Sequence, residues 1–169
     1  MKNQGVEAIL SIGSNIGDSK ANLNRSCHYL ERACGSIIRL SSFYESEAWG
    51  FQADQKFLNA VVVLQTQLRP MQLLEKLKGI EVEMGRDIQK RDGYASRIID
   101  IDIIDYNQAV FKSDSLTIPH VHMKERCFVL QPLIEVCPDY KHPINKGFDI
   151  TQALENLGCA SGLKKIPNR

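Results

Sequence analysis

The sequence predicts an α+β fold in which an antiparallel β-sheet is covered by two helices on one face. Four segments are rich in apolar and β-branched residues, as buried strands are. They are Val6–Gly13, Ile37–Ser46, Phe57–Leu68 and Arg97–Asp105. Two further segments, Lys20–Cys34 and Pro70–Met84, repeat apolar residues at helical spacing. The segments follow one another in the order β-α-β-β-α-β, which is that of split βαβ, ferredoxin-like folds.

The first half of this pattern begins with a short apolar strand, Val6–Gly13, that ends at a glycine. Ser14, Asn15 and Asp18 then offer side chains that can cap a helix, and Leu23 begins a row of apolar residues at spacings of four, three and four. Gly35 ends this helix. The second and third strands are joined by Ser46–Lys56, a connection longer than a tight hairpin needs.

The second half begins at Pro70, because proline is favoured in the first turn of a helix. Three leucines and an isoleucine share one stripe of this helix, and Gly85 ends it. The last core strand reads RIIDIDIID. Since side chains alternate along a strand, Ile99 and its alternate neighbours share one face, and Asp100 and Asp102 share the other.

Asp100 and Asp102 predict a positively charged partner. Two residues of rise separate their carboxylates by about 7 Å, so each disfavours the ionisation of the other unless a cation, water or a shared proton intervenes. An edge strand with a polar outer face would show the same spacing. Arg97 lies three residues before Asp100, so it reaches the acidic face only if the chain bends near Arg97–Ile98.

The chain from about residue 107 onward is expected to extend this core. SLTIPH predicts a strand, MKERCFVLQPL predicts a short helical turn, and Asp149 can cap a last helix. The sequence holds no repeat, linker or low-complexity segment. We therefore expect one domain over residues 1–169, with a core of about 5–106 and an extension of about 107–169.

Composition favours a small-molecule ligand. The formal net charge of +1 provides no global field that would attract nucleic acid or an anionic membrane. Five cysteines without a Cys-x-x-Cys spacing favour free thiols in a reducing compartment. The N-terminal region turns polar too early for a signal peptide, and no apolar run approaches the roughly 20 residues of a membrane span. We expect a cytoplasmic protein without nucleic-acid or membrane partners.

The segment GRDIQKRDGYASR, Gly85–Arg97, concentrates positive charge in a chain that is otherwise close to balance. Its cations are Arg86, Lys90, Arg91 and Arg97. Guanidinium groups bind phosphate oxygens well, although a charged loop can also be merely solvated. Beside Asp100 and Asp102 this segment fits nucleotide chemistry, because Mg²⁺ is held by one or two carboxylates together with phosphates.

Other motifs are less specific. No Gly-x-x-x-x-Gly-Lys-Ser/Thr sequence is present, which excludes a P-loop, and Gly13–Gly17 lacks the full dinucleotide pattern. His120 and His122 form a His-x-His, but no third ligand stands at zinc spacing, so a ligand-binding or core role is favoured. Phe57 and Asn59 share one strand face, where they can pack ordinarily or hold a flat heterocycle.

Taken in order, these segments resemble the 6-hydroxymethyl-7,8-dihydropterin pyrophosphokinases of folate biosynthesis. The resemblance covers about Ile9–Pro138 and is carried by GSN, SSFYES, FLNAVV, YASRIIDIDII and IPHVHMKERCFVLQPL. Its most specific part is Arg-x-x-Asp-x-Asp followed by Pro-His-x-x-Met. The resemblance implies transfer of the β,γ-pyrophosphoryl group of ATP to the hydroxymethyl oxygen of 6-hydroxymethyl-7,8-dihydropterin. AMP would be released, and two Mg²⁺ ions would assist.

Position by position, the resemblance also implies roles for matching residues. The implied catalytic residues are Arg86, Arg97, Asp100 and Asp102, and the two aspartates would hold both Mg²⁺ ions. The implied ATP-binding residues are Lys78, Glu81, Arg86, Arg97, Thr117, His120 and Arg126. The implied pterin-binding residues are Ser46, Trp49, Gly50, Phe57, Asn59, Tyr94 and Phe128. Among these, Phe57 and Phe128 would form aromatic walls and Asn59 would read the amide edge.

The chain also departs from the family pattern. Tyr94 stands where many relatives have tryptophan, Ala95-Ser96 replaces a common Gly-Pro, and Val121 replaces an aromatic residue. A second hypothesis is a ferredoxin-like RNA-binding or ligand-sensing module without catalysis. RNA readout needs exposed aromatics on a basic sheet surface, whereas Asp100 and Asp102 repel phosphate without a metal. Release of AMP from MgATP in the presence of the reduced pterin separates the two hypotheses.

Overall fold

The computed structural model describes residues 5–86, 95–159 and 162–167. In chain order its elements are β1 (Val6–Ser14), α1 (Ser19–Ala33), β2 (Ser36–Leu40), β3 (Phe43–Ser46), β4 (Phe57–Thr66), α2 (Pro70–Glu83), β5 (Asp100–Tyr106), β6 (Phe111–Lys112), β7 (Thr117–Ile118), the 3-10 turn η1 (Met123–Glu125), α3 (Cys127–Val136), α4 (Ile150–Asn156) and β8 (Leu163–Ile166). The predicted β-α-β-β-α-β core is present, and the segment Ile37–Ser46 forms two strands instead of one.

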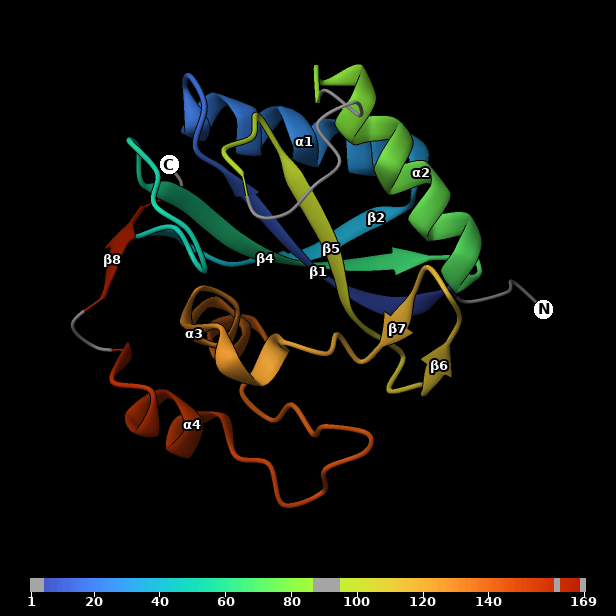
Figure 1. Ribbon diagram of the computed structural model, residues 1–169. Helices are drawn as coiled ribbons and strands as arrows, with labels where there is room; N and C mark the ends of the chain where they lie inside the picture. The colour runs from blue at the N-terminus through green and yellow to red at the C-terminus, as the bar shows by residue number, and fades with distance from the viewer. Residues whose placement is uncertain (1–4, 87–94, 160–161, 168–169) are drawn as a thin grey trace.

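The main sheet is antiparallel and has the order β5-β1-β4-β3-β8, with β2 also paired to β4 (Figure 1). β1 therefore lies between β4 and β5. Its register sets Ser11 opposite Asp102 and Gly13 opposite Asp100. On the other side of β1, Gly13 pairs with Asn59. Residues from three different parts of the chain thus meet on adjacent strands.

Helices α1 and α2 cover one face of the sheet, as predicted (Figure 1). Asp18 caps α1, since its side chain accepts a hydrogen bond from the Ala21 backbone N–H at 2.9 Å. Buried leucines of both helices pack against Ile99 and its alternate neighbours on β5. This packing confirms the predicted orientation of β5, with its apolar side toward the helices and Asp100 and Asp102 on the opposite side.

The C-terminal extension covers part of the second face of the sheet. The segment predicted as a short helical turn forms η1 and then the longer helix α3, whose Leu130 and Leu133 are fully buried. α3 packs on Ile9, Val61 and Ile104, which point away from α1 and α2. The central strands are therefore buried on both sides, which explains why β1 and β4 are nearly continuous apolar runs.

Two features of the extension were not predicted. Strand β8 pairs with β3, with Phe43 opposite Ile166, and lengthens the main sheet. The predicted strand SLTIPH is short, with only Thr117–Ile118 paired to Phe111–Lys112. The predicted last helix is present, and Asp149 caps it as predicted: its side chain accepts a hydrogen bond from the backbone N–H of Gln152 at 2.8 Å.

The expectation of five free thiols is wrong for two cysteines, because Cys127 and Cys159 form a disulfide. They lie 32 residues apart, and packing of α4 near the start of α3 brings them together. No local spacing signals such a pair. Cys27, Cys34 and Cys137 are free. Among the described residues, none of the helices combines the length and apolarity that crossing a membrane requires.

Candidate active site

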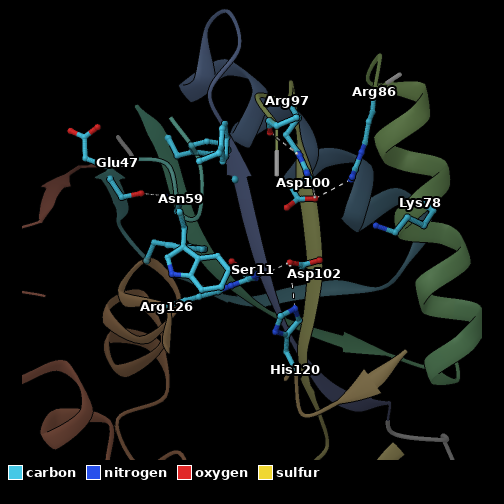
Figure 2. A pocket seen from close by; sticks show the side chains of 17 residues that line it. Ser11, Glu47, Asn59, Lys78, Arg86, Arg97, Asp100, Asp102, His120 and Arg126 are labelled. Carbon is cyan, nitrogen blue, oxygen red and sulfur yellow. Dashed lines mark hydrogen bonds and ion pairs between the residues drawn. The ribbon is translucent and has the colours of Figure 1, made fainter. Parts of the chain in front are cut away.

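A cavity of about 350 Å³ lies on the second face of the sheet, beside the start of α3 (Figure 2). Its floor is formed by β1, β4 and β5, and its sides come from α2, the connection after β3, and the segment that leads into α3. The predicted site residues that line it are Ser46, Trp49, Phe57, Asn59, Lys78, Arg86, Arg97, Asp100, Asp102, His120, Arg126 and Phe128. Residues scattered over half of the sequence therefore meet at one place.

Asp100 is held by two arginines on one of its oxygens. Its Oδ1 accepts from Arg97 Nη1 at 2.7 Å and from Arg86 Nη1 at 2.9 Å. Burial alone would raise the pKa of this carboxyl, but Arg97 and Arg86 outweigh burial and hold the pKa below its usual value. Asp100 is therefore ionised at neutral pH.

Arg97 reaches Asp100 because the chain bends before β5, as the sequence required. Asn15, just after β1, holds this bend: its Oδ1 accepts from the Arg97 backbone N–H at 2.8 Å, and its backbone N–H donates to the Arg97 carbonyl at 3.1 Å. The Asn15 side chain also donates to Ser96 Oγ at 2.9 Å and to the Gln55 carbonyl at 3.3 Å. The asparagine of the GSN motif thus links both loops at the rim of the cavity.

Asp102 has weaker contacts. Arg126 Nη1 lies 3.4 Å and His120 Nε2 lies 3.8 Å from its Oδ2. Burial, and then the charge of Asp100, raise the pKa of Asp102 to about 6. Burial, and then the charge of Arg126, lower the pKa of His120 to about 4, so this imidazole is neutral at physiological pH. Asp102 therefore has little compensating charge of its own.

Glu81 lies beneath the cavity and does not line it. Its side chain is 1% exposed. It accepts a hydrogen bond at 2.7 Å from the backbone N–H of Ile101, the residue between Asp100 and Asp102. It also accepts from Arg86 Nη1 at 2.6 Å and Lys78 Nζ at 3.1 Å. This buried carboxylate therefore contacts two cations and the backbone of β5.

Asn59 presents its carbonyl oxygen to the cavity. Its Nδ2 donates to Ser46 Oγ at 2.9 Å and to the Tyr44 carbonyl at 3.3 Å, so both amide hydrogens are used. Its Oδ1 lies 2.8 Å from the place that a Cβ on Gly13 would occupy. A side chain at position 13 would displace this amide. The position of Asn59 therefore explains why the GSN motif begins with a glycine.

Arg126 stacks against aromatic rings at the other side of the cavity. Its guanidinium lies 4.6 Å from the ring centre of Trp49 and 5.7 Å from that of Phe128. Its Nε is buried and has no hydrogen-bond partner within the described part of the chain. The Trp49 side chain thus packs on an expected ATP ligand, and its ring also lies 5.6 Å from that of His122.

The remaining predicted residues are distributed as follows. Thr117 and Gly50 do not line the cavity, and Tyr94, Lys90 and Arg91 lie outside the described residues. Over the described ranges, no group of three or more His, Cys, Asp or Glu side chains is arranged around a metal position. Residues that line the cavity without having been predicted are Ser11, Gly13, Glu47, Phe51 and Ala95. Strand alternation could have revealed two of them, because Ser11 and Gly13 interrupt the apolar pattern of β1.

The sequence model of the 7,8-dihydro-6-hydroxymethylpterin-pyrophosphokinase (HPPK) family matches residues 9–138, the stretch that contains every described residue lining the cavity. The chain belongs to this family. Three relatives are each named 2-amino-4-hydroxy-6-hydroxymethyldihydropteridine pyrophosphokinase. The relative from Porphyromonas gingivalis is 41% identical over 136 residues, which is 79% of this chain and 92% of the relative.

Two further relatives carry the same name. The protein of Aquifex aeolicus is 39% identical over 135 residues, which are 80% of this chain and 82% of the relative. The protein of Methylorubrum extorquens is 37% identical over 160 residues, which are 94% of this chain and 98% of the relative. HPPK enzymes transfer the pyrophosphoryl group of ATP to 6-hydroxymethyl-7,8-dihydropterin in folate biosynthesis, and this is the reaction of this chain.

Solved structures show the same fold at low sequence identity. The crystal structure of Plasmodium falciparum HPPK-DHPS wild type with pteroate has a TM-score of 0.75 at 18% identity. The match covers 98% of this HPPK and 48% of that chain, so this HPPK spans about half of the solved protein. A second structure, of HPPK-DHPS in complex with substrates, has a TM-score of 0.74 at 16% identity. These matches support the fold.

Proposed function

We propose that the cavity beside α3 is the site of pyrophosphoryl transfer, with ATP over β5 and α2 and the pterin over β4. One observation carries this proposal. The two acids of β5, the cations around them, and a slot with an amide and aromatic rings open into the same 350 Å³ space. Both substrates need to meet with their reacting atoms aligned, and a shared cavity allows this.

The cations are suited to hold the triphosphate of ATP. Arg86, Arg97 and Arg126 present guanidinium groups to the cavity, and Lys78 adds an ammonium group from α2 (Figure 2). Because the pyrophosphoryl group gains and shifts negative charge during transfer, fixed positive groups around it lower the barrier. His120 is neutral at physiological pH, so we assign it a hydrogen bond to ATP and no charge.

Two Mg²⁺ ions are proposed at Asp100 and Asp102. The residues fit them: all contacts of Asp100 are made by Oδ1 and all contacts of Asp102 by Oδ2, so within the described residues each carboxylate keeps one oxygen without a partner. Carboxylate oxygens together with phosphates are the ligands that Mg²⁺ prefers. When bound, the ions would neutralise phosphate charge and polarise the attacked phosphorus.

The pterin is proposed to lie between Phe57 and Phe128, with its amide end at Asn59. Asn59 Oδ1 accepts hydrogen bonds, so it matches the N–H donors of the pterin pyrimidine ring. Ser46 fixes the amide in this orientation by accepting from its Nδ2. No covalent intermediate with the protein is needed, since the hydroxymethyl oxygen attacks the β-phosphorus directly and AMP leaves.

Other residues complete the proposal. Glu81 acts indirectly through Lys78 and Arg86. Gly50, Thr117 and Tyr94 belong to the proposed site only through the residue-by-residue resemblance of the sequence to the family. We also propose a cytoplasmic location on the ground that ATP is abundant there, since the Cys127–Cys159 disulfide removes the support from free thiols. Cell fractionation tests this location.

The site proposal is tested by following AMP formation from ATP and 6-hydroxymethyl-7,8-dihydropterin. We expect AMP in place of ADP, and we expect EDTA to stop the reaction and excess Mg²⁺ to restore it. A matched control is Glu7→Gln, an exposed carboxylate on β1 far from the cavity that should not matter. Full activity of the wild type in EDTA would contradict the magnesium proposal. Unchanged activity after Arg86→Ala would contradict the cavity assignment.

A further inference from the structure

Ser11 is a cavity residue with no role in the site proposed so far. It lies on β1, the central strand of the floor, and is 8% exposed. Figure 2 shows it beside Asp102 and Arg126. Within the described residues its hydroxyl has no hydrogen-bond partner among the side-chain contacts of the structure. Because Ser11 lines the cavity, its hydroxyl is available to a molecule that binds there.

The strand register places Ser11 between the two ends of the proposed site. Asp102 lies directly opposite Ser11 on β5. On the other side of β1, Asn59 is opposite Gly13, two residues further along. Neighbouring strands lie about 4.8 Å apart, so β4 and β5 are separated by roughly 10 Å across β1. A molecule that contacts Asn59 and extends toward Asp102 therefore crosses β1 over Gly13 and Ser11.

Gly13 strengthens this conclusion. It is the other β1 residue that lines the cavity, and it has no side chain. Ser11 is therefore the β1 position that offers a polar side chain to the floor among the described residues lining the cavity. A hydroxyl can donate or accept a hydrogen bond and rotates to suit its partner.

The chemistry of the pterin identifies the matching atom. Between its amide carbonyl and its hydroxymethyl arm, the ring edge carries the nitrogen N5, which is an imine acceptor in the 7,8-dihydro form. With the amide end at Asn59 and the arm toward Asp102, this edge crosses β1. We propose that Ser11 Oγ donates a hydrogen bond to N5 and thereby sets the direction of the hydroxymethyl arm. This inference rests on the proposed pterin orientation.

The test compares two ligands and two variants. The natural pterin and its 5-deaza analogue, in which CH replaces N5, are titrated in the presence of Mg²⁺ and a non-hydrolysable ATP analogue. Ser11→Ala should weaken binding of the natural pterin about fivefold, as expected for one neutral hydrogen bond. It should leave the affinity for the 5-deaza analogue and for the nucleotide unchanged. Ser11→Thr, which keeps the hydroxyl, should restore most of the affinity for the natural pterin.

A matched control is Ser26→Ala, which removes a fully buried hydroxyl on the opposite side of the sheet, where Ser26 donates to the Leu23 carbonyl. Ser26→Ala should change the affinity for neither the natural pterin nor its 5-deaza analogue. If Ser11→Ala weakens binding of the natural pterin and of the 5-deaza analogue equally, or weakens neither, the contact with N5 is overturned. If the wild type releases AMP from the natural substrate in either case, the proposed function stands while this inference fails. A wild type that releases no AMP contradicts the function itself.

Discussion

At the scale of single residues, the two acids of β5 have the same sequence environment but different electrostatic surroundings. Asp100 has two arginine partners on Oδ1, and they hold its pKa below the usual value against the effect of burial. Asp102 has one arginine at 3.4 Å and a neutral histidine at 3.8 Å, and burial together with Asp100 raises its pKa to about 6. Without a bound cation, Asp102 is therefore the less stabilised carboxylate of the two.

Asp100→Ala and Asp102→Ala should each lower kcat at least tenfold and leave the protein folded. Both carboxylates face the cavity, away from the helix-covered core, so their removal opens no core void. AMP release measures activity, and thermal unfolding checks the fold. If either variant keeps more than a tenth of the wild-type kcat with Mg²⁺, the assignment of these acids to the metals is wrong.

Asn59→Ala should weaken pterin binding by about 1 to 3 kcal/mol and leave ATP binding nearly unchanged. The reason is that removal of Oδ1 leaves donors of the pterin buried without a partner. Isothermal titration of each ligand alone measures both affinities. A matched control is Thr66→Ala, which removes a buried side chain at the far end of the same strand. Equal losses for pterin and ATP in Asn59→Ala would show a structural role.

Arg97→Ala should lower kcat much more than it weakens binding of MgATP. Its guanidinium contacts Asp100 beside the proposed phosphate position, so its charge matters most when charge builds up on the leaving oxygen. Single-turnover kinetics measure the chemical step, and nucleotide titration measures binding. A variant with an unchanged chemical step and weaker nucleotide binding would contradict a contact in the transition state.

At the scale of elements, the site depends on the extension as much as on the core. β1, β4 and β5 supply the floor, while the segment into α3 supplies Arg126 and Phe128. α3 is fixed on the sheet by its apolar face and is followed by Tyr140, whose hydroxyl donates to the buried Asp105 at the end of β5 at 2.8 Å. This hydrogen bond joins the extension to the strand that carries the acids.

Tyr140→Phe should therefore lower the free energy of unfolding by about 1 to 3 kcal/mol, because Asp105 keeps its burial and loses a donor. Urea unfolding followed by circular dichroism measures this loss. Tyr29→Phe, on α1 and away from Asp105, is the matched control and should have a smaller effect. An unfolding free energy equal to that of the wild type would show that the Tyr140 hydroxyl does not hold the extension to β5.

At the scale of the whole molecule, we propose that core and extension unfold as one domain, joined by the β3–β8 pairing and by the disulfide. One thermal transition is expected. Since the disulfide closes a loop of 32 residues, reductant should lower stability by about 3 kcal/mol and Tm by about 10 °C. The double variant Cys127→Ser, Cys159→Ser should not respond to reductant. Two separate transitions would contradict the single domain, and a Tm independent of reductant in the wild type would contradict the disulfide.

Much of the site could be predicted from the sequence, but the partners of its residues could not. Strand alternation placed Asp100 and Asp102 on the face away from the core, and the structure confirms it. The same rule required the bend at Arg97. It could not show that Asn15 makes this bend, because the two residues are 82 positions apart and meet only when β1 lies beside β5.

The sequence by itself determined the order of the core elements, the acidic face of β5 and the family, because alternation, helical spacing and motif order depend on residues close together in the chain. Only the tertiary structure decided that α3 covers the second face, that Trp49 packs on Arg126, that Ser11 lies on the cavity floor, and that Cys127 pairs with Cys159. These contacts join distant segments, and they form only where burial of apolar faces brings whole elements together.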